Sequence, residues 1–220
     1  MSIVVCAEQR DGKLSKVTFE ALSEGKRLAA ASGETLKALV IGSGVAGCAD
    51  ELKKYGADEI AVADSDALAA YTTETYAAVL AAFIAQESPA LVLLGHSSIG
   101  RELAARAAAG ADCGLVSDCI AIEFADGDYI FKHPIYAGKA IGSFKVAGPI
   151  RMATLRPNVF DIAEADGAGA VVDFAPEIPA AKVTVKAVNK ASGDRPELSE
   201  ADIICSGGRG LGGPEGFKLI

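Results

Sequence analysis

The sequence predicts an α/β fold of three layers, in which a Rossmann-like parallel sheet carries appended antiparallel strands. Short apolar runs alternate with helical patterns over residues 3–109, as in a parallel sheet with helices on both faces. Strand-like segments follow one another between residues 117 and 155 without helices between them, so antiparallel strands are expected at the end of that sheet. Of the 220 residues, 50% are hydrophobic and 23% are charged, which is enough apolar material for a packed core.

The alternating region is expected to hold its strands and helices in strict succession. Each strand is a short apolar run, and each helix has apolar residues at helical spacing. The strands are expected at 3–7, 36–41, 59–63 and 90–94, and the helices at 17–31, 45–55, 73–86 and 99–109. Gly33 and Gly56 are expected to end the first two helices, because glycine readily adopts the left-handed conformation of a helix end.

The rest of the chain predicts strands, a linker and a second domain. The further strands are expected at 117–123, 129–133, 139–146, 150–155 and 182–188, with a hairpin turn at Asp126-Gly127. Residues 161–179 are rich in Ala, Gly, Asp and Pro and are interpreted as a loop, and the polar residues 189–200 as a domain boundary. We therefore expect an N-terminal α/β domain, residues 1–190, and then a linker and the truncated start of a C-terminal domain, residues 191–220.

Charge and cysteine content exclude several classes of function. The net charge of −8 argues against nucleic acid or an anionic membrane as a partner, because both require a basic surface. No apolar run reaches the ~18 residues of a membrane span, and the chain enters its first strand without a basic leader. Five scattered cysteines with no Cys-x-x-Cys pair, and only two histidines, predict no metal site. The cysteines are interpreted as buried core residues of a protein in the reducing cytoplasm.

One motif favours a dinucleotide site. Residues 42–47 spell G-x-G-x-x-G between a strand and a helix, and Asp64 lies 20 residues past Gly44. This spacing is typical of a loop that holds a pyrophosphate and an acid that binds a ribose hydroxyl. An NAD-binding oxidoreductase domain is therefore one hypothesis. The alternative is a tight turn, because the motif follows the second expected strand rather than the first.

A second loop, residues 95–102, has the glycine spacing of a P-loop. Arg101 and Glu102 stand where that motif requires lysine and a hydroxyl residue, so no phosphate clamp is expected. Ser97 or Ser98 is instead expected to cap the following helix. His96 is too isolated in the sequence to be assigned a catalytic role.

The last residues form a different kind of loop. An expected strand at 201–205 leads into Ser206-Gly207-Gly208-Arg209-Gly210-Leu211-Gly212-Gly213, and a helical pattern begins at Pro214. Glycines at a helix start expose backbone N–H groups, and one arginine adds a positive charge, so the loop is predicted to bind a phosphate-bearing cofactor. The alternative is a solvated arginine in a polar tail.

These stretches together resemble the α-subunit of electron transfer flavoprotein. The resemblance covers nearly the whole chain and rests on Leu93-Leu94-Gly95-His96-Ser97-Ser98-Ile99-Gly100-Arg101, Gly114-Leu115-Val116-Ser117-Asp118, Pro134-Ile135-Tyr136-Ala137-Gly138-Lys139-Ala140, Thr154-Leu155-Arg156-Pro157, Arg195-Pro196-Glu197-Leu198, Ser206-Gly207-Gly208-Arg209-Gly210-Leu211 and Phe217-Lys218-Leu219.

The resemblance implies an electron carrier rather than an enzyme. It implies a heterodimer in which the N-terminal domain packs against a β-subunit and a flavodoxin-like C-terminal domain binds FAD. Arg209 is the implied FAD contact, with Ser206, Gly207 and Gly208 beside it, and the other FAD motifs of the family are missing from this chain. Electrons are expected to come from donor dehydrogenases and pass to a quinone reductase or similar acceptor. A cofactor-free scaffold that binds a β-like subunit is the remaining hypothesis.

Overall fold

The computed structural model describes residues 1–188, 201 and 203–219. The chain forms two compact units, Met1–Lys186 and Ala187–Ile220, and each is described by itself. The domain boundary predicted at residue 190 falls outside the described residues and stays a prediction.

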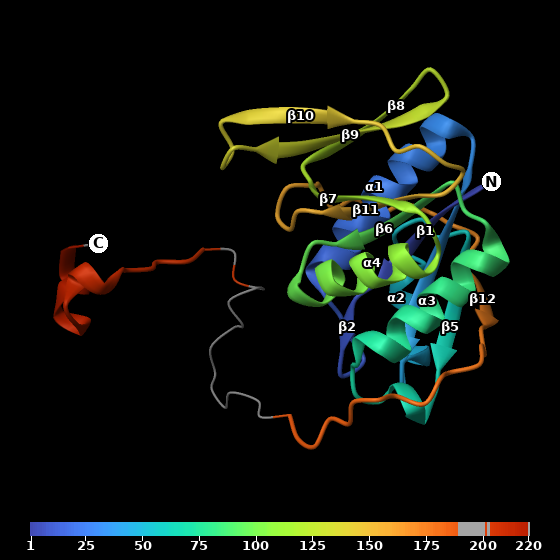
Figure 1. The fold of residues 1–220 in the computed structure, drawn as a ribbon, viewed down its shortest axis with the longest axis horizontal. Helices are drawn as coiled ribbons and strands as arrows, with labels where there is room; N and C mark the ends of the chain where they lie inside the picture. Colours follow the sequence, from blue (N-terminus) through green and yellow to red (C-terminus); the bar gives the residue numbers. More distant parts are fainter. Residues whose placement is uncertain (189–200, 202, 220) are drawn as a thin grey trace. The chain divides into compact units, whose positions relative to one another are not determined.

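The first unit is built on a seven-stranded parallel sheet, which confirms the predicted fold class (Figure 1). Strand β1 is buried along its whole length, as expected for a central strand covered on both faces. The strand order is β12-β5-β4-β1-β6-β11-β7. The strands are β1 (Ser2–Ala7), β4 (Thr35–Gly42), β5 (Glu59–Asp64), β6 (Leu91–Gly95), β7 (Gly114–Cys119), β11 (Arg151–Leu155) and β12 (Ala170–Asp173).

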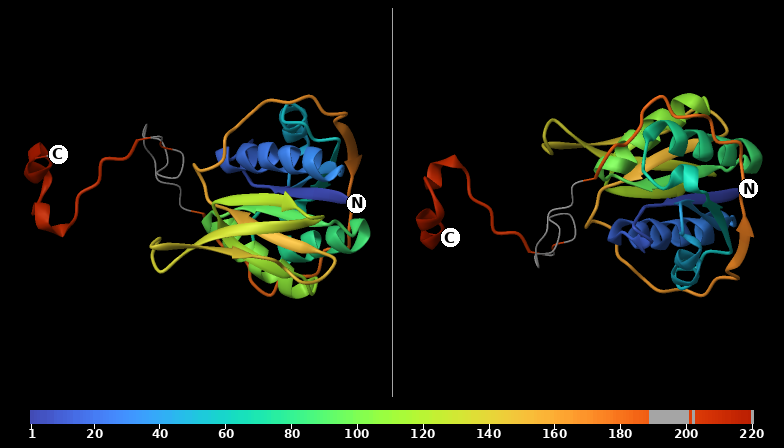
Figure 2. Two further views of the ribbon diagram at one scale, coloured as in Figure 1. Left: turned by 90° about the horizontal axis from the view of Figure 1, so that it is seen from above. Right: turned by 90° about the horizontal axis from the view of Figure 1, so that it is seen from below.

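Helices cover both faces of this sheet (Figure 2). Side chains alternate across β1, so Ile3 and Val5 belong to one core cluster while Val4 and Cys6 belong to the other. The first cluster packs under α1 (Lys16–Ser32) and α2 (Ala49–Leu52), and the second under α3 (Thr73–Glu87) and α4 (Ser98–Gly110). Gly33 ends α1 in the left-handed conformation with φ of 74°, as predicted. No helix in the described part of the chain is long and apolar enough to cross a membrane.

The predicted antiparallel strands are present and form a sheet of their own. Strands β8 (Ala121–Ala125), β9 (Asp128–Ile135) and β10 (Ala140–Phe144) form a separate three-stranded sheet. Strand β11 then returns to pair in parallel with both β6 and β7. Parallel neighbours need a long crossover connection, and the excursion through β8–β10 supplies it in place of a helix. The predicted turn is confirmed, because Asp126 and Gly127 both have positive φ.

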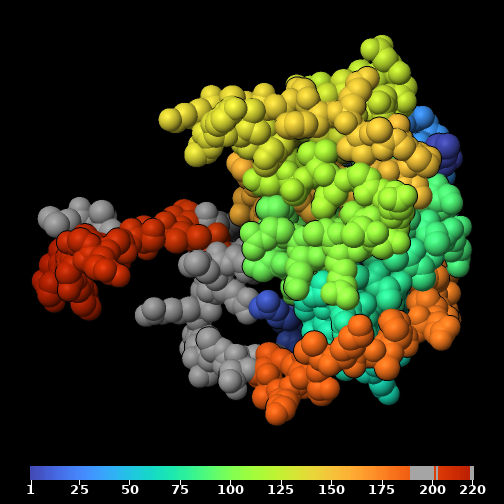
Figure 3. Space-filling view, viewed as in Figure 1, coloured from blue at the N-terminus to red at the C-terminus, as the bar shows by residue number. Residues whose placement is uncertain are grey.

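The chain between residues 157 and 188 also differs from expectation. The predicted loop 161–179 contains β12, which pairs in parallel with β5 and closes one edge of the sheet. The strand predicted at 182–188 is absent, because no described strand pairs with these residues, which are all exposed. In Figure 3 the orange segment 174–188 crosses the surface of the first unit. We call residues 174–188 the strap.

The remaining described elements are short. They are β2 (Gln9–Arg10), β3 (Lys13–Leu14), η1 (Ala46–Cys48), η2 (Asp66–Leu68), η3 (Arg209–Leu211) and η4 (Pro214–Leu219). The strand predicted at 201–205 does not form in its described residues 201 and 203–205, where Ile203 and Ile204 are exposed and unpaired with any described strand. The helical pattern from Pro214 is present as 3-10 turns.

The cysteines are free thiols, and their burial follows the prediction only in part. Cys6, Cys48 and Cys119 are buried, and burial raises the pKa of Cys6 and of Cys119 to about 12. Cys113 is half-buried, and Cys205 is exposed, contrary to expectation. The expected strand around Cys205 would have covered its side chain, and that strand does not form in its described residues.

Candidate functional site

The glycine loop of the second unit folds tightly around Leu211. The Leu211 amide donates to the Gly208 carbonyl at 3.1 Å, and the Gly212 amide donates to the Arg209 carbonyl at 3.1 Å. Gly212 has φ of 71°, a conformation that favours glycine. A Cβ atom at Gly207 would lie 1.9 Å from a methyl carbon of Leu211, so the close turn requires glycine there.

The structure brings the predicted cofactor-binding residues together on one exposed surface. Ser206, Gly207, Gly208 and Arg209 are consecutive and exposed. A hollow beside them is lined by Gly207, Gly208, Arg209, Leu211, Gly212, Gly213, Pro214 and Phe217. The neighbouring cation, Lys218, is paired with Glu215, whereas Arg209 forms no ion pair with any described residue. Its guanidinium is therefore available to an anion, while its assignment to a cofactor stays a prediction.

The dinucleotide motif of the first unit is a self-contained turn. The Asp64 carboxylate accepts hydrogen bonds from the Gly44 amide at 2.8 Å and from the Val45 amide at 2.9 Å. These amides are the groups that a pyrophosphate would use, and the acid that would bind a ribose hydroxyl occupies them. Gly42 is required by packing, because a Cβ there would lie 2.5 Å from a methyl carbon of Val45. The tight-turn interpretation therefore accounts for Gly42, Gly44 and Asp64.

The P-loop-like segment, residues 95–102, also forms hydrogen bonds within the first unit. Ser97 caps α4, because its hydroxyl oxygen accepts from the Gly100 amide at 2.9 Å, as predicted. The same hydroxyl donates to the Glu8 carboxylate, which places a negative charge beside the start of α4. The pocket between the ends of β1 and β6 has a free volume of about 40 Å³. Small-molecule sites typically need ~300–1,000 Å³, so this pocket is too small for a nucleotide without rearrangement.

Sequence reasoning missed a polar cluster around Thr154, which lies at the carboxyl end of β11. The fully buried Thr154 hydroxyl accepts from the Asp118 amide at 2.9 Å and lies 2.8 Å from His96 Nδ1. Burial lowers the pKa of His96, in agreement with a neutral ring.

Asp118 is the other centre of this cluster. Its carboxylate receives two hydrogen bonds from Arg156, at 2.9 and 2.6 Å, which lower its pKa. Its carbonyl accepts from His133 Nδ1 at 3.2 Å. Asp118 has φ of 58°, a strained conformation for aspartate that these contacts hold in place. The cluster joins β6, β7, β9 and β11. Three of these strands, β6, β11 and β7, are neighbours in the parallel sheet, so their carboxyl ends lie side by side.

The β9–β10 hairpin presents apolar side chains to solvent. Tyr136 is 78% exposed, Ile141 60% and Phe144 40%, so three large apolar side chains of this hairpin face solvent. The neighbouring Ile135 is half-buried. We call Tyr136, Ile141 and Phe144 the hairpin patch.

Comparison with known proteins identifies one family throughout. The family model described as electron transfer flavoprotein domain matches residues 3–191. The chain is 44% identical over 218 residues to electron transfer flavoprotein subunit alpha of Syntrophomonas wolfei, a match that covers 98% of this chain and 68% of the relative. It is 37% identical over 220 residues to the subunit of the same name from Bacillus subtilis, with 99% and 67% covered. A third relative, acryloyl-CoA reductase electron transfer subunit beta of Anaerotignum propionicum, is 41% identical over 128 residues, with 58% and 35% covered.

Proposed function

Because the chain belongs to the electron transfer flavoprotein family, we propose that its cofactor is FAD and that residues 206–209 bind it. The chain is an electron carrier subunit rather than an enzyme, as are the alpha subunits that it resembles over nearly its full length. The observation that supports the proposed site is Arg209, an exposed cation without an ion pair among the described residues, in a loop of glycines.

The residues of the loop fit a phosphate-bearing flavin. Gly207 and Gly208 have no side chains to keep a phosphate away from the backbone, and the hollow beside them is open to solvent. Arg209 supplies charge-assisted hydrogen bonds, each worth about 1.5–3 kcal/mol. When bound, the flavin supplies the oxidation and reduction, and the chain holds it in position.

These four residues account for only part of a tight site. A nanomolar dissociation constant corresponds to about 12 kcal/mol, several times what one arginine contributes. We therefore expect the 220-residue chain to bind FAD weakly. The hollow is formed within the second unit, so its lining does not depend on the first.

We propose an electron transfer flavoprotein β-subunit as the partner of the first unit, with the hairpin patch as its contact surface. An exposed group of large apolar side chains on a soluble domain commonly marks such a contact. The names of the relatives as alpha subunits support a heterodimer. Donor dehydrogenases are proposed as the source of its electrons. We propose that the electrons pass to a quinone reductase or similar acceptor. The proposed location is the cytoplasm, without membrane insertion.

A scaffold role for the first unit is favoured by a separate observation. Its two glycine loops are closed by Asp64 and Glu8, which are the chain's own carboxylates. The first unit therefore needs no nucleotide to complete its turns. We propose that it positions partners while the second unit binds the flavin.

Titration of the full chain with FAD, followed by flavin fluorescence, tests the proposed site. Arg209→Ala should weaken binding about tenfold to a hundredfold, the equivalent of one lost charge-assisted bond. Lys218→Ala is the matched control, because Lys218 is an exposed cation of the same unit that is already paired with Glu215. Equal affinities of the wild type and Arg209→Ala would refute the assignment of Arg209.

A further inference from the structure

The strap is held to the first unit in two different ways. At its start, the Phe174 amide donates to the Val62 carbonyl at 2.9 Å, and the Phe174 ring packs 5.0 Å from the ring of Phe83. Ile178 packs against the same core cluster. From residue 181 to residue 188 every side chain is exposed, so apolar packing no longer holds the chain.

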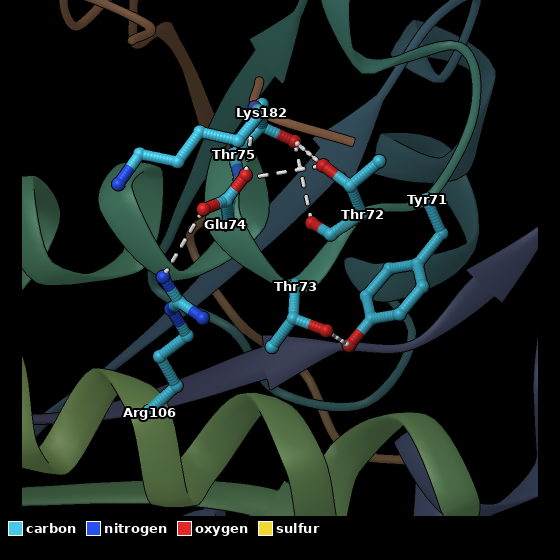
Figure 4. Close-up of polar contacts among 7 residues, drawn as sticks. All are labelled: Tyr71, Thr72, Thr73, Glu74, Thr75, Arg106 and Lys182. Atoms are coloured by element: carbon cyan, nitrogen blue, oxygen red, sulfur yellow. Dashed lines mark hydrogen bonds and ion pairs between the residues drawn. The ribbon is translucent and has the colours of Figure 1, made fainter. Parts of the chain in front are cut away.

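A single polar contact fixes the second half of the strap. Between residues 175 and 188, the Lys182 amide is the one backbone group with a hydrogen bond to the rest of the first unit, and it donates to Glu74 Oε2 at 2.8 Å. Figure 4 shows Glu74 between this amide and Arg106. Arg106 Nη2 lies 3.5 Å from Glu74 Oε1, so the carboxylate bridges α3, α4 and the strap.

Local structure holds Glu74 in place for this contact. Thr72 caps α3 by accepting from the Thr75 amide, which puts Glu74 in the first helical turn, where a negative charge is favoured. Beyond Lys182 the strap passes a hollow of about 360 Å³, lined in part by Val183 and Val185. Val183 is 62% exposed, so the strap here is not packed against the helices below it. The Glu74 bond therefore marks the last fixed point of the first unit.

We propose that Glu74 and Arg106 form a latch that fixes where the chain leaves the first unit on its way to the glycine loop. This inference rests on the proposed function for its biological role, because that loop is the proposed flavin site. The latch holds Lys182, 24 positions before Ser206, and without it the last packed residue is Ile178, 28 positions before Ser206. The four additional residues extend the reach of the loop by up to about 13–14 Å. Glu74 is thus a positioning residue for electron transfer.

The direct test measures distances within the full chain, without cofactor. Cys205 is exposed and accepts a spin label, and a second label is attached at Ser143→Cys on the first unit, in a Cys113→Ser background. Electron–electron double resonance should give a broader distance distribution in Glu74→Ala than in the parent. Glu74→Gln keeps an oxygen for the Lys182 amide and should restore much of the parent distribution. Glu102→Ala, a carboxylate of the same hollow that does not contact the strap, should leave it unchanged.

Hydrogen exchange of the strap provides the second measurement. The Lys182 amide should exchange about tenfold to a hundredfold faster in Glu74→Ala, as expected for loss of a hydrogen bond to a charged acceptor. Unchanged exchange would overturn the latch, and faster exchange with an unchanged distance distribution would overturn its positioning role. Neither measurement involves flavin. Failure of FAD to bind would therefore count against the proposed function and leave these results intact.

Discussion

Asp64 provides a direct test of how the first unit uses its glycine motif. Its carboxylate accepts from the amide of Val45, which is buried, and from the amide of Gly44, which is exposed. In Asp64→Ala the amide of Val45, a buried residue, loses its charged acceptor. A lost hydrogen bond to a charged group costs about 1.5–3 kcal/mol, whereas the exposed Gly44 amide regains water and contributes little.

The expected result is a loss of stability that does not depend on nucleotide. A change of 1 kcal/mol shifts the melting temperature of a domain of this size by about 2–4 °C, so Asp64→Ala should melt about 3–12 °C lower. Asp64→Asn keeps one acceptor oxygen and should lose less. Asp50→Ala is the control, because the Asp50 side chain is 88% exposed and, among the described residues, pairs with Lys53 alone, so its removal should cost little.

Adding NAD distinguishes this account from the dinucleotide hypothesis. If Asp64 bound a ribose, a hundredfold excess of NAD over its dissociation constant would stabilise the wild type by about 2.7 kcal/mol and leave the alanine variant unaffected. We expect no stabilisation in either protein. An unchanged melting temperature in Asp64→Ala, together with an NAD-dependent rise in the wild type alone, would refute the self-contained turn.

Three further predictions concern the other sites. Burial lowers the folded-state pKa of His96 below the unfolded value of ~6.5, so wild-type stability should fall as the pH drops through 6.5, and His96→Asn should show a flatter pH profile in chemical unfolding. Arg156 lowers the pKa of Asp118, so at pH 7 the wild type should be more stable than Asp118→Asn by about 1 kcal/mol. This difference in stability should disappear below pH ~4, and a difference that persists in acid would contradict the ion pair. Tyr136→Ser with Ile141→Ser should weaken β-subunit binding at least fivefold in calorimetry while stability changes by no more than about 0.5 kcal/mol, and unaffected binding would exclude the hairpin patch.

Local sequence signals predicted the structure correctly where it depends on residues that are adjacent in the chain. Gly33 ends α1 and Ser97 caps α4 as predicted, because a helix end is decided by the few residues around it. The return of β11 to a place between β6 and β7 was not predictable, because periodicity gives strands but not their order. The alternation at 182–188 likewise predicted a strand, yet a strand requires a partner that none of the described strands supplies.

The candidate sites also differed in whether the sequence could predict them, depending on how far apart their residues lie in the chain. The loop at residues 206–209 was recognisable because its glycines and its arginine are consecutive in the sequence. The cluster of His96, Asp118 and Thr154 was not, because 58 positions separate His96 from Thr154, and only the parallel pairing of β6 and β11 brings them together. The motif at Gly42 matches a dinucleotide site in spacing, while its place after the second expected strand favours a tight turn. The hydrogen bonds of Asp64 distinguish the two.

The placement of charge explains why the flavin is assigned to the second unit. In open parallel sheets, ligands bind at the carboxyl ends of the strands, where exposed amides attract anions. In the first unit Asp64 and Glu8 already place negative charge in the two loops at that edge, so an incoming phosphate would meet repulsion as well as occupied donors. In the second unit the glycine loop carries no acid within residues 206–214, and Arg209 has no ion pair among the described residues. An anionic cofactor therefore gains attraction at Arg209 that the first unit does not offer, and this difference favours the second unit as its site.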